Sequence, residues 1–479
     1  MVPLDMFHGL FESIKALQHA PVYHLVFEAG LIVWLMWLLF MKSYSLTDKQ
    51  KLTKKEEQEL IDEWMPEPLV PVTPVSSRAL HPRIVSSKVG KYIQLGDRQC
   101  LNLATHNYLG LIENPKIEEA ALKCLSHYGV GSCGPRGFYG TTEVHLDLED
   151  KLAEYMGCEE AVVYSYGFST IASAIPAYSK RSDVIFVDEM VNFAIQKGLD
   201  ASRSRIFFFK HNDVEDLERI LMEQADLDRK NPKRAKRTRR FLVAEGIYMN
   251  TGEMAPLPRL LELREKYKLR FFLDESVSFG TIGKNGHGIT EYYNIDPAEL
   301  DMISGSLEYA VGSIGGFCVG SHFIIEHQRL SGLGYCFSAS APPLMMAAAI
   351  TSLDIMKKDP SIFQTLKSNC IFMHEKLNSL LISELRVFAH PESVVKHIRL
   401  AIPSGDKTKD EEILNDIVMQ CEEANLALTT AAYLTDQEKK LPEPSIRITV
   451  NALLTKIEME SAIKTINKAA AAVLSSKCS

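Results

Sequence analysis

A glycine-rich string between residues 129 and 140 is the first place where this sequence could do chemistry. It holds five glycines around Cys133 and Arg136. Glycine lets the backbone approach a ligand closely, and free backbone N–H groups in such a loop suit a phosphate group. The alternative is that the string is a structural turn that binds nothing. Residue types alone leave both interpretations open.

A second segment, Ile303–Gly320, contains the pair Gly315-Gly316. It resembles the lysine loop of the α-oxoamine synthases, pyridoxal-phosphate enzymes whose lysine forms a Schiff base with the cofactor aldehyde. Counting back from the paired glycines puts Tyr309 in the place of that lysine. A phenol cannot form an imine, so the covalent step of such enzymes is not available at this position.

Further motifs of the same family follow in chain order over roughly residues 90–460. They are His106–Leu111, Gly129–Thr141, His145–Glu149, Tyr166–Thr170, Glu245–Asn250, Asp274–Gly280, Phe337–Pro343 and Arg447–Val450. Ordered motifs in this number are strong support where a single one would be weak. The resemblance implies a fold-type I pyridoxal-phosphate-dependent transferase of the α/β class. Such a protein has a large domain with a mixed or mostly parallel sheet, followed by a small C-terminal α+β domain.

Three functional groups of the catalytic family members are missing together, the lysine replaced by Tyr309 among them. Asn192 stands where a histidine would stack on the pyridine ring, and Val277 where a second histidine would lie beside the cofactor. Asp274 remains in the place of the carboxylate that pairs with the pyridine nitrogen, although it could equally be a structural cap. Arg447 lies where the family holds a substrate carboxylate, or it is only an arginine at an interface or core edge. We therefore predict no catalytic site of this chain's own.

The apolar N-terminal segment and the glycine-rich string together make the chain similar to the first long-chain-base subunits of eukaryotic serine palmitoyltransferase. In that family a lysine-bearing second subunit binds pyridoxal phosphate. The pair condenses L-serine with palmitoyl-CoA to 3-ketosphinganine at the endoplasmic reticulum. The resemblance further implies small activating membrane subunits and Orm-like regulatory proteins as partners.

The same resemblance implies a shared active site, since fold-type I dimers build each site at the subunit interface. We therefore expect this chain to supply groups to the partner's cofactor site. The candidates are Cys133, Gly134, Arg136, Ser338 and Ala339. The alternative is that Ser338 is an ordinary loop hydroxyl.

Two other classes of function stay open. The first is an active homodimeric α-oxoamine synthase that uses an unplaced lysine, such as Lys284. The second is a membrane scaffold whose enzyme-like body only recruits regulators. Cofactor absorbance in the isolated chain would indicate the first, and partner activity without this chain would favour the second.

The elements that must position these residues alternate between apolar strands and helices. Short apolar runs predict strands at 161–164, 184–187, 206–209, 241–244 and 271–273, and helical spacing predicts helices at 214–224 and 257–266. Such alternation favours an α/β domain, which we place at 92–345. Helices at 346–356 and 363–381, strands near 395–402 and 446–450, and a closing helix at 456–473 predict a smaller domain at 346–479.

The first 91 residues have a different character. We expect an amphipathic segment at 1–22, a transmembrane helix at 23–42, and a charged helix with a proline-rich tether at 43–91. The apolar run is close to the length that spans a bilayer, although Glu28 must then lie near an interface or meet a polar partner. A buried or re-entrant helix is the alternative. Lysines gather after the run, so the positive-inside rule predicts a cytosolic body on a single-pass anchor.

Composition excludes some classes of function and of binding site. The formal net charge of −8 argues against a general nucleic-acid binder. The basic run at 229–240 is more simply a solvated loop, or a surface facing anionic lipid headgroups. Nine scattered cysteines indicate reduced thiols rather than a disulfide framework, and no spacing predicts a metal site.

Overall fold

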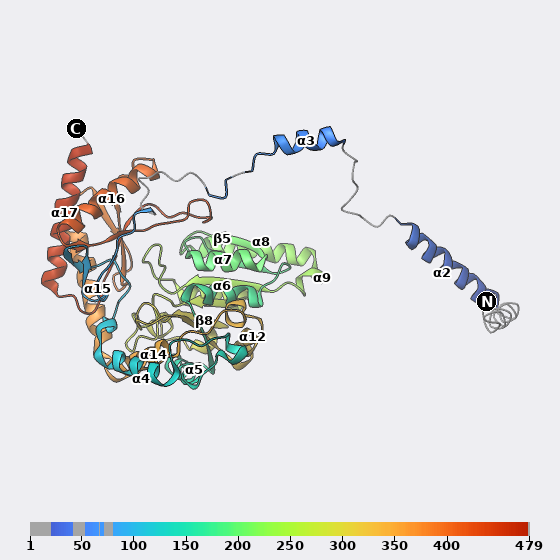
Figure 1. The fold of residues 1–479 in the computed structure, drawn as a ribbon, viewed down its shortest axis with the longest axis horizontal. Coiled ribbons are helices and arrows are strands. Elements are labelled where there is room, and N and C mark those ends of the chain that lie inside the picture. The colour runs from blue at the N-terminus through green and yellow to red at the C-terminus, as the bar shows by residue number, and fades with distance from the viewer. Residues whose placement is uncertain (1–20, 42–52, 67, 71–79, 478–479) are drawn as a thin grey trace. The chain divides into compact units, whose positions relative to one another are not determined.

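The computed structural model describes residues 21–41, 53–66, 68–70 and 80–477. The chain divides into two compact units, 1–82 and 83–479 (Figure 1). The predicted amphipathic segment and most of the predicted tether lie outside the described residues. The domain boundaries that we expect within 92–479 therefore stay predictions, because the second unit is one compact body.

The first unit contains two helices. Helix α2 (Val22–Phe40) has 19 residues, none of them buried, and is long and apolar enough to cross a membrane. Helix α3 (Lys54–Glu63) agrees with the predicted charged helix. It begins at a capping box, in which the Thr53 side chain accepts from the Glu56 N–H and the Glu56 carboxylate accepts from the Thr53 N–H.

A seven-stranded sheet organises the large part of the second unit. Its order is β3-β9-β8-β7-β6-β4-β5. The strands are β3 (Glu160–Tyr164), β4 (Val184–Asp188), β5 (Arg205–Phe209), β6 (Arg240–Glu245), β7 (Arg270–Asp274), β8 (Met302–Ser306) and β9 (Gly316–Gly320). Only β9 runs against its two neighbours, so the sheet is mixed as predicted. Strands β4, β8 and β9 are buried throughout, as expected for a sheet covered on both faces.

Helices cover this sheet. They are α4 (Pro115–Tyr128), α5 (Glu143–Met156), α6 (Gly167–Tyr178), α7 (Phe193–Ser202), α8 (Val214–Lys230), α9 (Pro232–Ala235), α10 (Leu257–Tyr267), α11 (Ile289–Tyr292), α12 (His322–Ser331), α13 (Leu333–Cys336) and α14 (Pro343–Lys358). Helices α4, α5 and α14 lie side by side, whereas α6 packs against α7 away from them (Figure 1). The polypeptide therefore surrounds the sheet and buries its apolar faces.

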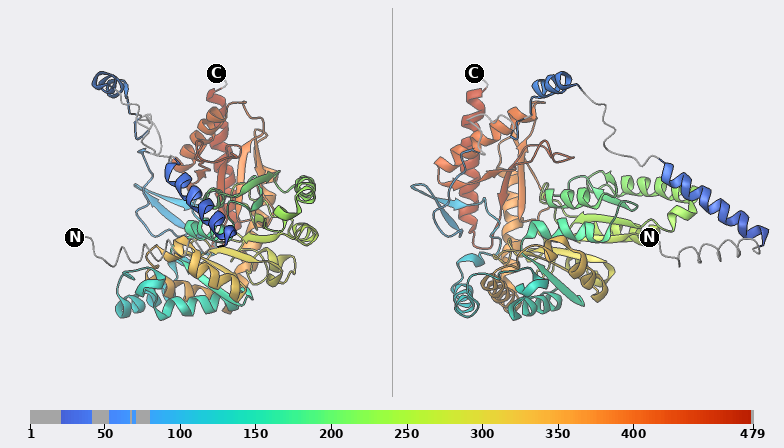
Figure 2. Two further views of the ribbon diagram at one scale, coloured as in Figure 1. Left: turned by 90° about the vertical axis from the view of Figure 1, so that its right-hand side faces the viewer. Right: turned by 45° about the vertical axis from the view of Figure 1, so that its right-hand side comes forward.

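Two smaller sheets and three long helices make up the rest of the unit. One sheet joins β1 (Tyr92–Leu95), β2 (Arg98–Asn102) and β12 (Leu426–Ala427), and the other has the order β10 (Leu385–Phe388), β11 (Val395–Leu400), β14 (Ile446–Thr449), β13 (Thr429–Thr430). Helix α17 (Lys456–Lys477) packs against both α15 (Ser361–Leu380) and α16 (Lys407–Glu423) beside these strands (Figure 2). The predicted fold class, a fold-type I α/β body followed by α+β elements, is confirmed.

The sheet also fixes where functional side chains meet. Glu245 and Asp274 are register partners at the carboxyl ends of β6 and β7, and Asp274 is in turn opposite Ser304 of β8. Parallel strands end at a common edge, where ligands bind in open α/β sheets. Three polar side chains from distant parts of the sequence thus come together at one edge of the sheet.

Candidate active site and partner-facing loops

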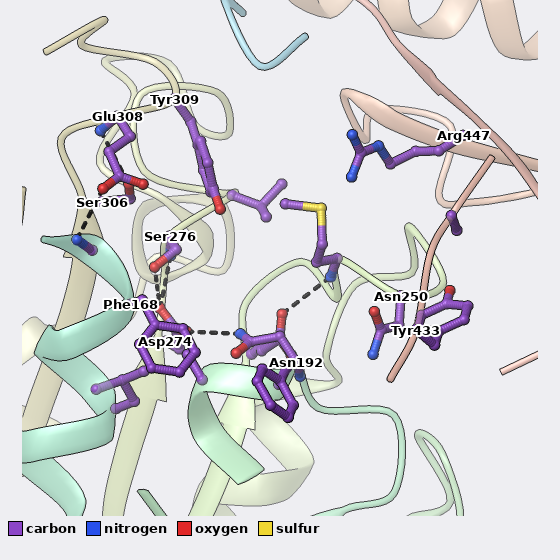
Figure 3. A pocket seen from close by; sticks show the side chains of 18 of the residues that line it. Phe168, Asn192, Asn250, Asp274, Ser276, Ser306, Glu308, Tyr309, Tyr433 and Arg447 are labelled. Atoms are coloured by element: carbon purple, nitrogen blue, oxygen red, sulfur yellow. Dashed lines mark hydrogen bonds between the residues drawn. The ribbon is translucent and has the colours of Figure 1, made fainter. Parts of the chain in front are cut away.

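A cavity of about 270 Å³ lies at this carboxyl edge. Its lining combines the ends of β6, β7 and β8 with the first residues of α6 and α7. Residues of the four-stranded sheet complete it (Figure 3). Five residues singled out in the sequence line it together, namely Asn192, Asp274, Val277, Tyr309 and Arg447. The structure therefore gathers these positions in one cleft, as the resemblance implied.

Asp274 is the best-connected group of the cleft. Its Oδ1 accepts hydrogen bonds from Ser276 Oγ at 2.5 Å and from Ser304 Oγ at 3.3 Å. Its Oδ2 accepts from the side-chain amide of Asn192 at 3.1 Å (Figure 3). Both carboxylate oxygens thus have partners within this chain. These contacts describe a structural pairing, and a cofactor contact of Asp274 stays a prediction.

A second buried carboxylate lies beside Asp274. Glu245 accepts from the backbone N–H groups of Asn192 at 2.5 Å and Met249 at 3.0 Å. Burial, and then the charge of Asp274, raise the pKa of Glu245 to about 8, and burial also raises the pKa of Asp274. Two neighbouring buried carboxylates cannot both ionise cheaply, so this pair holds a proton at neutral pH.

Tyr309 follows β8 and projects over the cleft (Figure 3). Its ring centroid lies 4.6 Å from that of His106 and 6.0 Å from that of Tyr108. Burial, and then the charges of Glu308 and Asp274, raise its pKa above the usual range. Burial lowers the pKa of His106 to about 3, so its ring is neutral. Tyr309 is therefore a neutral phenol packed among aromatic rings.

These residues do not fit a pyridoxal phosphate held covalently by this chain. No lysine is present among the described residues that line the cleft. Lys284, the lysine considered as an alternative, lines a separate cavity with Glu291, Tyr292 and Phe363. Asn192 donates a hydrogen bond to the Asp274 carboxylate, which is the group that would face a pyridine nitrogen.

Arg447 is the one arginine of the cleft lining within the described residues. It lies on β14, and its Nη2 donates a long hydrogen bond of 3.4 Å to the Ala104 carbonyl. Its buried Nε has no hydrogen-bond partner among the described residues. The guanidinium thus lines the cleft with one buried donor unbonded within the described residues.

The second predicted region joins the glycine-rich string to the turn at 337–343. Ser340 N–H donates to the Gly134 carbonyl at 2.9 Å, and Ser132 Oγ donates to the Ser340 carbonyl at 2.7 Å. Ser165 Oγ donates to the Ala339 carbonyl at 2.5 Å. Two segments that lie some 200 residues apart in the sequence are thereby held as one surface.

The residues of this surface differ in their exposure and in whether their side chains are already bonded within the chain. Cys133 is exposed and has a φ of 58°, a left-handed conformation that is uncommon for residues other than glycine. Arg136 is buried and forms a bidentate ion pair with Glu149, at 2.8 and 3.0 Å. Ser338 donates its hydroxyl to the Gly334 carbonyl. Cys133 and Ala339 are thus exposed, whereas the Arg136 guanidinium is used internally.

Comparisons with known proteins agree with this geometry. The family description "Aminotransferase class I and II" matches residues 98–466. "Serine palmitoyltransferase 1" of Dictyostelium discoideum is 42% identical, over 99% of this chain and 100% of its own length. "Long chain base biosynthesis protein 1b" of Oryza sativa subsp. japonica is 39% identical, over 94% and 92%. The chain belongs to the serine palmitoyltransferase 1 family, within the class I and II aminotransferases.

Solved structures support the fold of this serine palmitoyltransferase 1 family member. The serine palmitoyltransferase of S. paucimobilis with bound PLP and myriocin has a TM-score of 0.73 and 24% identity. The similarity covers 88% of this chain and 96% of the other. This likeness shows a PLP-dependent transferase fold, whereas the residues of the cleft determine what this chain itself can bind.

Sequence reasoning missed several polar groups of this family member's cleft. Ser276 and Ser304 hold Asp274, and Glu308 accepts from Gly167 N–H at 3.0 Å. Ser276 lies two residues from Asp274, so its proximity was a usable signal. Glu308 and Gly167 are 141 residues apart, and nothing in either segment indicates their contact.

Proposed function

We propose that this chain is the non-catalytic subunit of a heterodimeric serine palmitoyltransferase. The assembled enzyme condenses L-serine with palmitoyl-CoA to 3-ketosphinganine, releasing carbon dioxide and CoA, as the first step of sphingolipid synthesis. A lysine-bearing long-chain-base subunit 2 binds the pyridoxal phosphate. The observation that carries this proposal is Tyr309 in the lysine place of a cleft whose described lining contains no lysine, in a chain of the serine palmitoyltransferase 1 family.

The surface formed by the glycine-rich string and the turn at 337–343 supports a shared site. The partner's cofactor site would be completed by Cys133, Gly134, Arg136, Ser338 and Ala339. Arg136 would act indirectly, because its pairing with Glu149 holds the loop in shape. Exposed apolar side chains lie on the same two segments, namely Val130, Phe138, Tyr139 and Phe337. Exposed apolar groups gathered in this way are typical of protein interfaces.

Helix α2 is a candidate membrane anchor, and from it we infer where in the cell the chain resides. The chain would be a single-pass protein of the endoplasmic reticulum membrane with its body in the cytosol. Lys54 and Lys55 follow α2, which fits a cytosolic C-terminal side. Small activating membrane subunits, Orm-like regulatory proteins and membrane lipid would be its further partners.

A chemical label on the cofactor tests the proposal. The tagged chain is isolated from membranes with whatever accompanies it, reduced with borohydride, and digested, and the pyridoxyl-lysine is located by peptide mass. We expect the label on a co-purifying chain. A label on a lysine of this chain, such as Lys284, would support the homodimeric synthase instead. Full activity of the partner after removal of this chain would support a scaffold role.

A further inference from the structure

The amino-terminal end of α6 opens onto the cleft. Gly167 and Phe168, its first residues, are part of the cleft lining, and the N-cap residue Tyr166 forms no side-chain cap. The first backbone N–H groups of a helix have no partner within the helix, and together with the helix dipole they attract phosphate. A phosphate-bearing ligand in this cleft would therefore be expected to bind at this end of α6.

In this chain a carboxylate already lies there. Glu308 Oε1 accepts from the Gly167 N–H at 3.0 Å (Figure 3). A Cβ placed on Gly167 would lie 3.2 Å from the Glu308 carboxyl carbon, so the carboxylate packs directly against the first residue of the helix. The Glu308 N–H donates to Ser306 Oγ at 3.0 Å, which fixes the loop that carries it. Glu308 thus places a carboxylate at the end of α6 where a ligand phosphate would be expected to bind.

The rest of the cleft is also unfavourable for an added anion. Its described lining contains the carboxyl groups of Glu245, Asp274, Glu308 and Glu438 against the single guanidinium of Arg447, and the proton held by Glu245 and Asp274 removes only one of the negative charges. His397 does not add a cation, because burial lowers its pKa to about 3. A phosphate would bring further negative charge next to Glu308 without a new cation to balance it.

A second helix terminus at the cleft is closed in a similar way. Asn192 Oδ1 accepts from the Ile195 N–H at 3.1 Å and so caps α7, whose first residues also line the cleft. Both helices whose first residues line the cleft, within the described part of the chain, are therefore bonded by side chains of this chain. A ligand phosphate would have to displace one of them.

We propose that the Glu308 carboxylate substitutes for a ligand phosphate at α6 and so excludes phosphate-bearing cofactors from this chain's own cleft. The effect is separate from the missing lysine. Without lysine a cofactor cannot form an imine, but it could still bind noncovalently, and Glu308 prevents this as well. The inference concerns this cleft alone and does not depend on which partner the chain has.

Pyridoxamine 5′-phosphate is the probe, because it carries the phosphate but needs no lysine. The full chain, with its accompanying subunits, is first reduced with borohydride and freed of unbound cofactor, so that any lysine-bound cofactor is fixed in place. Calorimetric titration then compares the native chain with Glu308→Ala and Glu308→Gln. We expect no saturable binding to the native chain and a new site in Glu308→Ala. If the native chain binds the probe weakly, the Kd of Glu308→Ala should be at least about tenfold lower, which is about 1.4 kcal/mol in binding free energy. Glu308→Gln, which loses the charge but keeps an acceptor, should lie between them.

Two controls separate the charge at α6 from other effects. Glu438→Gln removes a carboxylate of the same cleft that bonds Leu434 N–H instead of α6, and it should gain no binding. Pyridoxamine without phosphate should not bind to Glu308→Ala. The proposal is overturned if the native chain binds the probe as tightly as Glu308→Ala, or if neither Glu308 variant gains binding while its thermal unfolding stays cooperative. If the reduction step labels no lysine on any chain, that result would count against the proposed function. The comparison of probe binding between the native chain and the Glu308 variants would still be valid.

Discussion

The side chain of Asn192 bonds two partners at once, since its amide donates to Asp274 at 3.1 Å and its oxygen caps α7 through Ile195 N–H. Asn192→Ala should lower the free energy of unfolding by about 2 kcal/mol, because a cap is lost and a buried acceptor loses its donor. Asn192→Ser, which can still cap the helix, should lose only about half as much. Urea titration of both variants would show this order, and equal losses would mean that the cap on α7 contributes nothing.

Breaking the buried ion pair of Arg136 and Glu149 should strongly destabilise the chain around the glycine-rich string. Both side chains are only 4% exposed, so truncating one leaves the other charge buried and unpaired. Glu149→Ala should therefore lower the free energy of unfolding by about 3–5 kcal/mol. The matched control is Glu118→Ala, whose pair with Lys88 is 2.7 Å long but more than half exposed, and which should cost less than about 1 kcal/mol. Equal effects in thermal unfolding would contradict this prediction.

His211 should make stability depend on pH. Burial alone would lower its pKa, but hydrogen bonds to Asp188 and Glu253 outweigh burial and raise the pKa to about 9. The folded chain then binds a proton more tightly than the unfolded chain, whose histidine titrates near 6.5. The contribution, roughly 3 kcal/mol at most, is present below pH ~6.5 and lost as the pH rises through 9.

The measurement is the difference in unfolding free energy between the native chain and His211→Gln at several pH values. We expect a large difference at pH 6 and a small one above pH 9. The difference isolates His211 from Glu245, whose raised pKa also lowers stability as the pH rises. A difference that does not change with pH would rule out a protonated His211.

Cys133 should tolerate small side chains but not bulky ones. It is exposed at a left-handed position beside the loops that we assign to the partner's site. Cys133→Leu should lower the turnover of the assembled enzyme by roughly 10- to 100-fold through misplacement of the neighbouring groups, while the subunits stay associated. CoA release by the purified complex measures this effect, gel filtration checks assembly, and Cys133→Ser serves as the small control. Unchanged turnover in Cys133→Leu would count against a shared site.

Helix α2 should hold the chain in the membrane by its apolar length. Leu31→Arg places a charge near the middle of α2, where insertion costs about 2.5–3.5 kcal/mol more. Phe40→Arg places the same charge at the end of the helix, where a long side chain can extend to the headgroups. We expect alkaline carbonate to extract more of the Leu31→Arg chain than of the Phe40→Arg chain. Equal extraction would indicate that α2 does not span the bilayer.

The sequence predicted the elements that bury apolar runs. Strands β4, β6 and β7 and helix α10 lie where their patterns placed them, because a covered parallel strand is a short continuous apolar run. Strands β8 and β9 were not predicted as strands. They carry serines and glycines, and only their pairing with neighbours gives them extended structure. Helix α6 was also not predicted, and Pro176 lies within it.

The cleft could be predicted in part. Motif resemblance brought Asn192, Asp274 and Tyr309 to one place, and the structure has them lining one cavity. The contact between Glu308 and Gly167 could not be predicted, because it depends on how a loop after β8 meets a helix that begins 141 residues earlier. Nor did any pattern show that the Arg136 guanidinium is paired internally with Glu149.

The position of Glu308 beside Tyr309 also has an evolutionary consequence. A mutation that placed lysine at position 309 would supply an amine while Glu308 still bonds Gly167. A mutation that removed Glu308 alone would open the end of α6 but supply no amine. Neither single step would give selection a functional cofactor site to favour. The division of labour between two subunits that we propose would therefore be hard to reverse by single mutations.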